Sequence, residues 1–277
     1  MTSPSPDALK AAARQIRTDV LGMCYRAQSS HIGSSLSCVD IFTTLYIGRV
    51  LKFDAKNADW PMRDYFILSK GHASAVLYAT LARAGFFPAA ELETYYQNGS
   101  KLPGHPSKGC MPGIEVSTGS LGHGLGLGCG MASALKMDKK TNRVFVVLSD
   151  GELDEGSVWE AVLFAGARKM GNVIAIIDYN KLQSFGRVEE VLPLEPLEAK
   201  FRAFGWETAR LDGNDIDSLL RLFSSDFMKS EKPKAIIADT VKGQGVSFMM
   251  NRLEWHYKSL SKEQYDKATK ELMEDGM

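Results

Sequence analysis

The sequence predicts a single α/β domain whose mostly parallel central sheet is flanked by helices. Three continuous apolar runs, each followed by polar or turn residues, are typical of buried strands in such a sheet: Tyr65–Leu68, Val144–Leu148 and Val173–Ile177. A helical segment over 154–170 joins the last two runs, so residues 143–180 form one βαβ unit. Because the 277 residues contain no repeat or linker, we expect one domain over residues 1–277.

The elements around the first strand are predicted from apolar spacing and turn residues. Apolar residues three and four positions apart predict an amphipathic helix over 7–28, and Ser34–Val50 predicts a second helix. After the strand we expect one helix through Ala84 and another over Glu91–Gln97. Glycine and proline then recur throughout Lys101–Gly130, which predicts a loop. A loop of this length in a compact domain favours a ligand site.

The last part of the chain predicts two helices and one strand. Residues 215–224 have helical spacing, and Ala235–Ala238 has the apolar character of a further strand. Ser261 and Gln264 form a capping-box pattern, which predicts a helix within 258–277. The first six residues, 1–6, are expected to be flexible.

The composition excludes several classes of protein. Lys and Arg number 33 and Asp and Glu also number 33, so no net charge attracts nucleic acid or an anionic membrane. We find no apolar run of about 18 residues and no signal-peptide pattern at the start. The four cysteines contain no C-x-x-C pair, which argues against a zinc site or a disulfide framework. We therefore expect a protein of the reducing cytoplasm.

Polar residues follow two neighbouring strands of the predicted βαβ unit. Asp150 and Gly151 come after the first strand, and Asn180 follows the second one thirty positions later. Carboxylate and amide oxygens at adjacent strand ends suit Mg²⁺ that is shared with phosphate oxygens. Taken singly, Asp150 reads as a helix cap and Asn180 as a turn residue. Their combined spacing instead favours a metal site.

The five histidines all lie in turn-like contexts, four of them within two residues of a glycine. They are His31, His72, His105, His123 and His256. A single loop histidine is usually solvated, but this distribution indicates that several converge on one cleft. Imidazoles there would donate hydrogen bonds to phosphates and hydroxyls or move protons near neutral pH. Lys242 opens a Lys-Gly-Gln-Gly turn after a strand, a weak pattern for holding phosphate.

Six ordered segments resemble the N-terminal, thiamine diphosphate-binding domain of transketolase. Asp150-Gly151 with Asn180 is similar to the thiamine diphosphate signature, G-D-G followed about thirty residues later by N. The segments are Ser30–Gly33, Leu68–Ala73, Leu102–Pro106, Glu115–Gly122, Asp150–Gly156 and Val241–Val246 with Trp255-His256. Together they span nearly the whole chain in the order of the family.

The resemblance implies roles for individual residues. It assigns Mg²⁺, with Ca²⁺ or Mn²⁺ as substitutes, to Asp150, the Asn180 side chain and the Leu182 carbonyl. It assigns thiamine diphosphate to these three residues and to His72, Gly119, Leu121, Gly151, Glu152 and His256. The catalytic set is His31, His72, His105 and His256, of which His31 and His105 match residues that contact the sugar. Glu155 resembles a carboxylate at a subunit interface.

Four positions depart from the family pattern. They are Ser149 for the first glycine of G-D-G, Ser30 before His31, His123 where glutamine is common, and Tyr257 where glycine often follows His256. Ser149 is expected to leave the metal site intact. His123 and Tyr257 bear on the range of substrates.

The resemblance also implies a partner. Transketolase needs a glutamate from a second domain to activate the cofactor, and no residue of this sequence matches it. We therefore expect the N-terminal subunit of a split transketolase, whose partner carries the pyrimidine-binding and C-terminal domains, in a heterotetramer of two copies of each chain. The expected reaction moves a two-carbon ketol unit from a ketose, often phosphorylated, to an aldehyde.

Two other functions remain open at this point. The α chain of a 2-oxo acid dehydrogenase shares the metal motif, although it is not expected to carry the Pro103–Pro106 or Leu68–Ala73 segments. A non-catalytic diphosphate-binding module is the second alternative. The matched histidines together with Asp150 and Asn180 argue against it.

Overall fold

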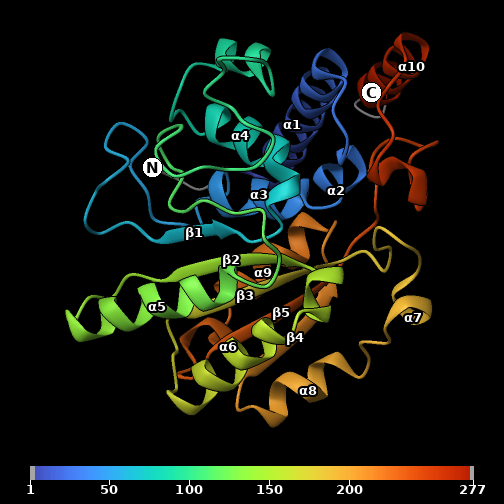
Figure 1. The fold of residues 1–277 in the computed structure, drawn as a ribbon. Helices are drawn as coiled ribbons and strands as arrows, with labels where there is room; N and C mark the ends of the chain where they lie inside the picture. The colour runs from blue at the N-terminus through green and yellow to red at the C-terminus, as the bar shows by residue number, and fades with distance from the viewer. Residues whose placement is uncertain (1–3, 275–277) are drawn as a thin grey trace.

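The computed structural model describes residues 4–274 and contains a five-stranded, fully parallel sheet with helices on both faces (Figure 1). The spatial order of the strands is β1-β2-β3-β5-β4. The strands are β1 (Tyr65–Leu68), β2 (Val144–Ser149), β3 (Val173–Tyr179), β4 (Glu207–Asp212) and β5 (Lys234–Asp239). The predicted fold class, α/β with a mostly parallel sheet, is confirmed.

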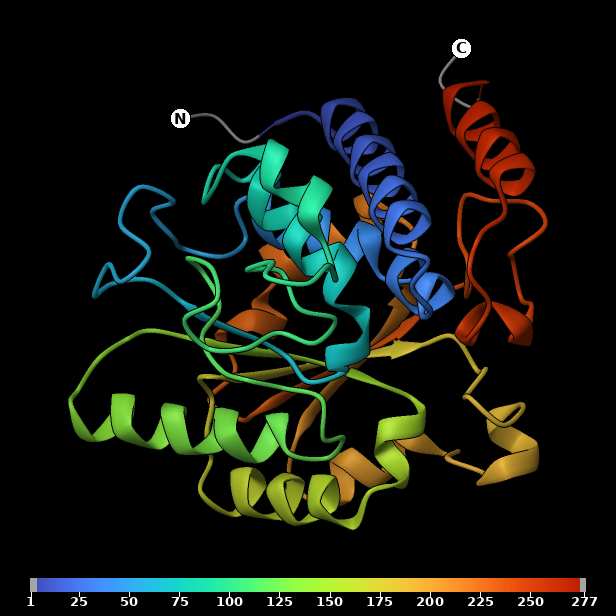
Figure 2. The same cartoon turned by 45° about the horizontal axis from the view of Figure 1, so that its top comes forward.

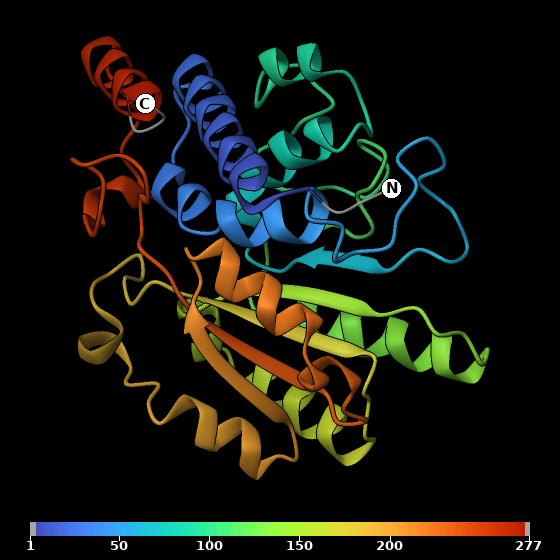
Figure 3. The same ribbon diagram turned by 180° about the vertical axis from the view of Figure 1, so that it is seen from behind.

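Helices form a layer on each face of the sheet. The first layer consists of α1 (Pro6–Ala27), α2 (Ile32–Leu36), α3 (Val39–Tyr46), α4 (Ser74–Arg83) and α9 (Ile216–Ser224). The second consists of α5 (Gly124–Met137), α6 (Gly156–Ala167) and α8 (Leu197–Ala203). Figure 3 shows α9 lying across the sheet when the molecule is seen from behind. The remaining helices are α7 (Val188–Val191), α10 (Lys262–Glu274) and the 3₁₀ helices η1 (Gly71–Ala73), η2 (Ala89–Thr94), η3 (Gly151–Asp154), η4 (Asp226–Lys229) and η5 (Leu253–His256).

Alternation along the strands divides the apolar side chains between two cores. In β2, Phe145 and Val147 pack against the first layer, whereas Val144, Val146 and Leu148 pack against the second. This follows from the two-residue period of a strand, whose successive side chains point to opposite faces. The continuous apolar runs of the sequence therefore describe strands that are covered on both sides.

Most of the predicted elements are present with similar boundaries. Residues 7–28 correspond to α1, 215–224 to α9 and Ala235–Ala238 to β5. The capping box is confirmed by two bonds: the Ser261 amide donates to Gln264 Oε1 at 3.1 Å, and the Gln264 amide donates to Ser261 Oγ at 3.2 Å. The helix that it opens, α10, lies beside α1 (Figure 2), where Tyr25 and Tyr265 stack with ring centroids 4.4 Å apart. Residues 1–3 and 275–277, at the ends of the predicted 1–6 and 258–277 segments, lie outside the described residues.

The predicted helix over Ser34–Val50 is two helices, α2 and α3, because a serine side chain interrupts it. Ser37 Oγ lies 3.1 Å from the carbonyl oxygen of Ser34 and 2.6 Å from Asp178 Oδ2. A hydroxyl that bonds its own backbone and a distant carboxylate competes with the regular helical ladder. The sheet thus determines where this helix breaks. The helix expected over Glu91–Gln97 is likewise shorter, a 3₁₀ turn at Ala89–Thr94.

The predicted loop Lys101–Gly130 is wrong in its last part, where α5 begins at Gly124. Its glycines allow the helix to approach the sheet. A Cβ atom added at Gly128 would lie 2.7 Å from Val146 Cγ2 in β2, so no larger residue fits without a shift. Glycine costs a helix conformational entropy, which is why the sequence pattern alone suggested a loop.

The edge strand β4 and the helix α8 are absent from the sequence prediction. The side chains of β4 are partly or fully exposed, and they lack both the continuous apolar run and a clean alternation. Its pairing with β5 is therefore a tertiary result. Across the described residues, no helix has the length and apolar character needed to cross a membrane.

Close packing of α5 on the sheet gives a prediction with a matched control. Gly128→Ala should destabilise the chain by about 1–3 kcal/mol, because the added methyl group meets Val146. Gly126→Ala lies in the same helix with open space around it and should stabilise the chain by about 0.5–1 kcal/mol. Urea unfolding of both variants measures the difference. Equal stability of the two variants would contradict the assigned packing.

Candidate active site

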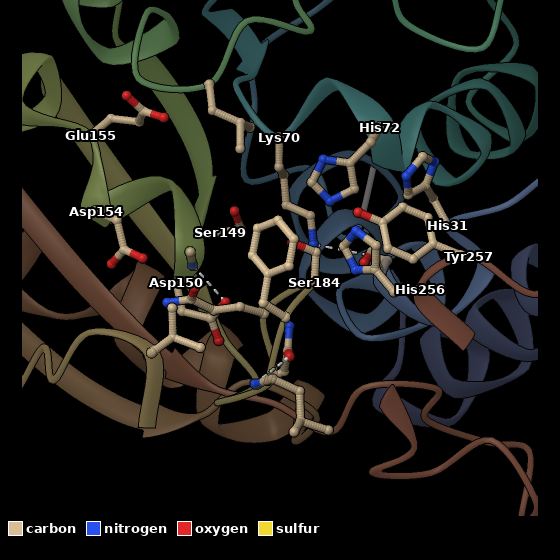
Figure 4. Close-up of a pocket in the computed structure, with 18 of the residues that line it drawn as sticks. His31, Lys70, His72, Ser149, Asp150, Asp154, Glu155, Ser184, His256 and Tyr257 are labelled. Atoms are coloured by element: carbon tan, nitrogen blue, oxygen red, sulfur yellow. Dashed lines mark hydrogen bonds between the residues drawn. The ribbon is translucent and has the colours of Figure 1, made fainter. Parts of the chain in front are cut away.

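A cavity of about 420 Å³ lies at the carboxyl ends of the strands (Figure 4). β1 leads into Lys70, β2 into Asp150 and β3 into Asn180, and all three residues belong to its wall. The carboxyl edge of a parallel sheet is where such folds bind ligands. The lining residues also include His31, His72, His105, His256, Gly119, Leu121, Gly151, Glu155, Leu182 and Tyr257.

The oxygen donors predicted for a metal converge at one side of this cavity. Asp150 is buried, and its two oxygens accept from the Gly151 amide at 2.8 Å and the Lys181 amide at 2.6 Å. Asn180 Oδ1 accepts from the Leu182 amide at 3.1 Å. The Leu182 carbonyl accepts from Lys242 Nζ at 2.8 Å, so this oxygen already faces a cation.

This donor set fits a hard divalent cation. Burial, followed by repulsion from Asp178, raises the pKa of Asp150 to about 6. A carboxylate, an amide oxygen and a backbone carbonyl are ligands of the kind that Mg²⁺ takes. Among the described residues, no three His, Cys, Asp or Glu side chains form a cluster that could hold a metal by themselves. A metal here would therefore be held by the Asp150 carboxylate together with neutral oxygens and a ligand's own oxygens.

A fully buried ion pair lies beneath these donors. Lys70 Nζ donates to Asp178 Oδ2 and, at 2.9 Å, to the Ser34 carbonyl, while Thr240 Oγ1 donates to the other oxygen of Asp178. Burial alone would lower the pKa of Lys70, but the Asp178 carboxylate raises it to about 12. Lys70 is thus a permanent cation in the cavity wall.

Four of the five histidines form a cluster at the other side of the cavity. The ring of His31 lies 5.2 Å from that of His72, 5.1 Å from that of His256 and 6.4 Å from that of His105, measured between centroids. The rings of His72 and His256 are 5.6 Å apart. The predicted convergence of several histidines is therefore observed, and Figure 4 shows His31, His72 and His256 on one wall. His123 lines a different cavity, between α5 and α6.

The clustered imidazoles are held in the neutral form. Burial, then the charges of His105, Lys242 and Lys70, lower the pKa of His31 to about 4. Burial and Lys242 lower the pKa of His256 to about 3, and burial lowers the pKa of His72 well below its ordinary value. At neutral pH each ring has one N–H donor and one nitrogen acceptor. Such rings can accept a hydrogen bond from a hydroxyl and donate one to a carbonyl oxygen.

The loop before α5 brings Gly119 and Leu121 to the cavity. Gly119 has a φ of +146°, and a Cβ there would lie 3.1 Å from His105 Cδ2, so glycine lets this loop pass the imidazole. Gly151 is one of the residues predicted to bind thiamine diphosphate. In this structure its amide donates a hydrogen bond to Asp150 Oδ1. Glu155 lines the cavity and is exposed.

Glu152 is placed differently from the other predicted cofactor residues. It is fully buried and does not line the cavity. Its carboxylate accepts from Ser69 Oγ, from the Gly122 amide at 2.9 Å and from the Ser149 amide at 3.4 Å. It therefore ties the Gly119–Gly122 loop to the ends of β1 and β2.

Three polar residues of the site have no role assigned from the sequence. Lys70 lies inside the Leu68–Ala73 segment, Lys242 only in a weak phosphate pattern, and Gln183 follows Leu182 without any motif. Lys242 is buried and donates to the Leu182 carbonyl, with its Nζ also 3.0 Å from His256 Nδ1. Within the described residues, Gln183 Nε2 is buried in the cavity wall without a hydrogen-bond partner. What marks these three residues as part of the site is their burial beside the cavity, and burial cannot be seen in the sequence.

A family model described as "Transketolase, thiamine diphosphate binding domain" matches residues 8–275. The chain belongs to the transketolase family. It is 40% identical over 268 residues to the 6-deoxy-6-sulfo-D-fructose transketolase subunit SqwG of a Clostridium species, with 97% of each chain covered. It is 42% identical to an apulose-4-phosphate transketolase subunit of Actinobacillus succinogenes, with 98% of each covered.

The structural comparison supports the same assignment. The crystal structure of transketolase from Campylobacter jejuni superposes with a TM-score of 0.90 at 32% identity, over 96% of this chain and 42% of that enzyme. Three predictions from the sequence are therefore confirmed: the family, the match to the N-terminal chain of a split transketolase, and the enzyme class, a transferase.

Neutral histidines in this transketolase-family chain give a testable pH dependence. The C2 proton resonances of His31 and His256 should not titrate between about pH 8 and about pH 5, because both pKa values lie near 4 or below. Unfolding returns the rings to their ordinary pKa of about 6.5. Their contribution to stability is thus full above about pH 6.5 and is lost as the pH falls toward 4.

Proton NMR of the ligand-free chain checks this, with His31→Gln and His256→Gln assigning the two signals. A titration step near pH 6.5 for either ring would contradict the burial that the structure assigns to it.

Proposed function

We propose that the chain is the N-terminal subunit of a two-chain transketolase that transfers a two-carbon ketol unit from a ketose to an aldehyde. The main support is its coverage of relatives that are named as subunits: 97% of the Clostridium protein and 98% of the Actinobacillus protein. By contrast, it covers 42% of the Campylobacter enzyme. The names of these relatives count against a 2-oxo acid dehydrogenase.

Thiamine diphosphate and Mg²⁺ are the proposed cofactors. We assign the metal to Asp150, the Asn180 side chain and the Leu182 carbonyl, where the donor set suits a hard cation. Lys70 and Lys242 supply positive charge beside it, which favours an anionic diphosphate. When bound, the cofactor supplies a nucleophilic carbon for cleaving the bond next to a ketose carbonyl.

The histidine cluster is assigned to the sugar and to proton movement. We assign His31 and His105 to substrate hydroxyls, and His72 and His256 to the boundary between the diphosphate and the reacting centre. A ring nitrogen that carries no proton can accept a hydrogen bond from a sugar hydroxyl, and can take its proton as the neighbouring C–C bond of the ketose breaks. The same ring can return a proton when the new bond forms.

The partner chain is proposed to cover the faces near Glu155 and α5. A second cavity of about 470 Å³ lies between α5 and α6, where Leu127 and Phe164 are exposed. Exposed apolar side chains in a groove are typical of an interface. We propose that the partner binds here in a two-plus-two assembly and supplies the glutamate that activates the cofactor.

The named substrates of the relatives narrow the class of ketose. One is a sulfonated sugar and the other a sugar phosphate. We infer that this chain also acts on a ketose that carries an anionic group.

The four cysteines are free thiols, which supports a reducing compartment such as the cytoplasm.

Isolation of the native complex tests the proposed function. The chain is tagged in its own organism, purified with its bound partner, and assayed with thiamine diphosphate, Mg²⁺ and a panel of ketoses and aldehydes. We expect ketol transfer by the complex and negligible transfer by the chain alone. Efficient turnover by the lone chain, or none by the complex, would refute the two-chain transketolase.

The metal assignment gives a second prediction with a control in the same cavity. In the complex, Asp150→Asn should weaken Mg²⁺-dependent binding of thiamine diphosphate by about a hundredfold or more, about 2.7 kcal/mol, because the one charged ligand is lost. Asp154→Asn removes a nearby carboxylate that we assign to no metal, and affinity should stay within about threefold. Titration calorimetry measures both. Unchanged affinity in Asp150→Asn would remove Asp150 from the metal site.

A further inference from the structure

Tyr257 lies at the histidine end of the cavity. It follows His256 at the end of η5, and its ring lies 4.7 Å from that of His256 and 5.9 Å from that of His31, between centroids. Both contacts are edge-on, with interplanar angles of 68° and 60°. Such contacts between aromatic rings are favourable and hold the phenol in place.

The backbone does not require a particular residue at this position. The φ of Tyr257 is −118°, in a region open to any side chain. The glycine that is common here in transketolases is therefore not demanded by the turn. What differs between glycine and tyrosine is the space left in the cavity.

Tyr257 lies at the open end of the cavity rather than at its floor. Tyr257 is 61% exposed, whereas Asp150 is 2% exposed and Lys70 is fully buried. In Figure 4, the ring lies beside His31 and His256, across the cavity from Asp154 and Glu155. A sugar held by these histidines would extend its remaining carbons past this ring.

We propose that Tyr257 is a specificity-determining residue that disfavours longer aldehyde acceptors. The phenol fills the space through which a longer acceptor would extend beyond His31 and His256. The restriction comes from the ring, since a ring of the same size without the hydroxyl fills the same space. This inference rests on the proposed function, because it assumes that the histidine wall holds sugars.

The test compares two acceptors that both carry a phosphate but differ in length. In the isolated complex, kcat/KM is measured for glyceraldehyde 3-phosphate and for ribose 5-phosphate with the wild type, Tyr257→Gly and Tyr257→Phe. Tyr257→Gly should raise the ratio for ribose 5-phosphate over glyceraldehyde 3-phosphate by about threefold or more, since hydrophobic pockets discriminate size by such factors. Tyr257→Phe should keep the wild-type ratio. A smaller change in the glycine variant, or an equal change in the phenylalanine variant, overturns the proposal.

A binding measurement separates this inference from the proposed reaction. Calorimetry with the unreactive glycerol 3-phosphate and ribitol 5-phosphate reports chain-length preference without any transfer. If the wild-type complex shows no ketol transfer but Tyr257→Gly shifts binding toward ribitol 5-phosphate by about threefold or more, the proposed reaction is wrong but selection of ligands by chain length at Tyr257 stands. If neither compound binds, or the preference does not shift, the inference is overturned. Because the ring is largely exposed, both variants should unfold at the wild-type temperature.

Discussion

The buried ion pair between Lys70 and Asp178 is the interaction on which the active-site end of the sheet depends. Neither side chain has exposed surface, and Ser37, Thr240 and the Ser34 carbonyl complete their hydrogen bonds. The pair joins the ends of β1, β3 and β5 to the α2–α3 layer. Removing one partner of such a pair leaves an uncompensated charge that typically costs about 3–5 kcal/mol. The position of the strand ends is therefore coupled to that of the helices that carry His31.

The same pair sets the electrostatics of the cavity. The ammonium of Lys70 adds to burial in lowering the pKa values of His31, His72 and His256. Across the cavity, burial and the nearby Asp178 carboxylate raise the pKa of Asp150. The site thus separates a corner suited to a metal from a wall of neutral proton acceptors.

The sequence predicted the parts of the site that follow from strand spacing. Asp150 and Asn180 lie at neighbouring strand ends because one helix joins parallel strands, and parallel pairing brings their carboxyl ends together. The convergence of histidines was predicted as a group, but the separation of His123 from the other four depends on where α5 begins. That boundary was missed because glycines at Gly124 and Gly128 weaken the helical pattern while allowing contact with the sheet.

By itself, the sequence determined the family, the parallel sheet and the oxygen donors at the strand ends, since these follow from local spacing and ordered motifs. Three properties were decided only by the tertiary structure. The histidines are neutral, Lys242 contacts the Leu182 carbonyl, and Glu152 is buried behind the cavity wall instead of lining it. These properties depend on burial. A residue is buried by contacts with segments that are far apart in the chain, as when His31 lies beside His105 and His256. A local sequence pattern does not include these contacts.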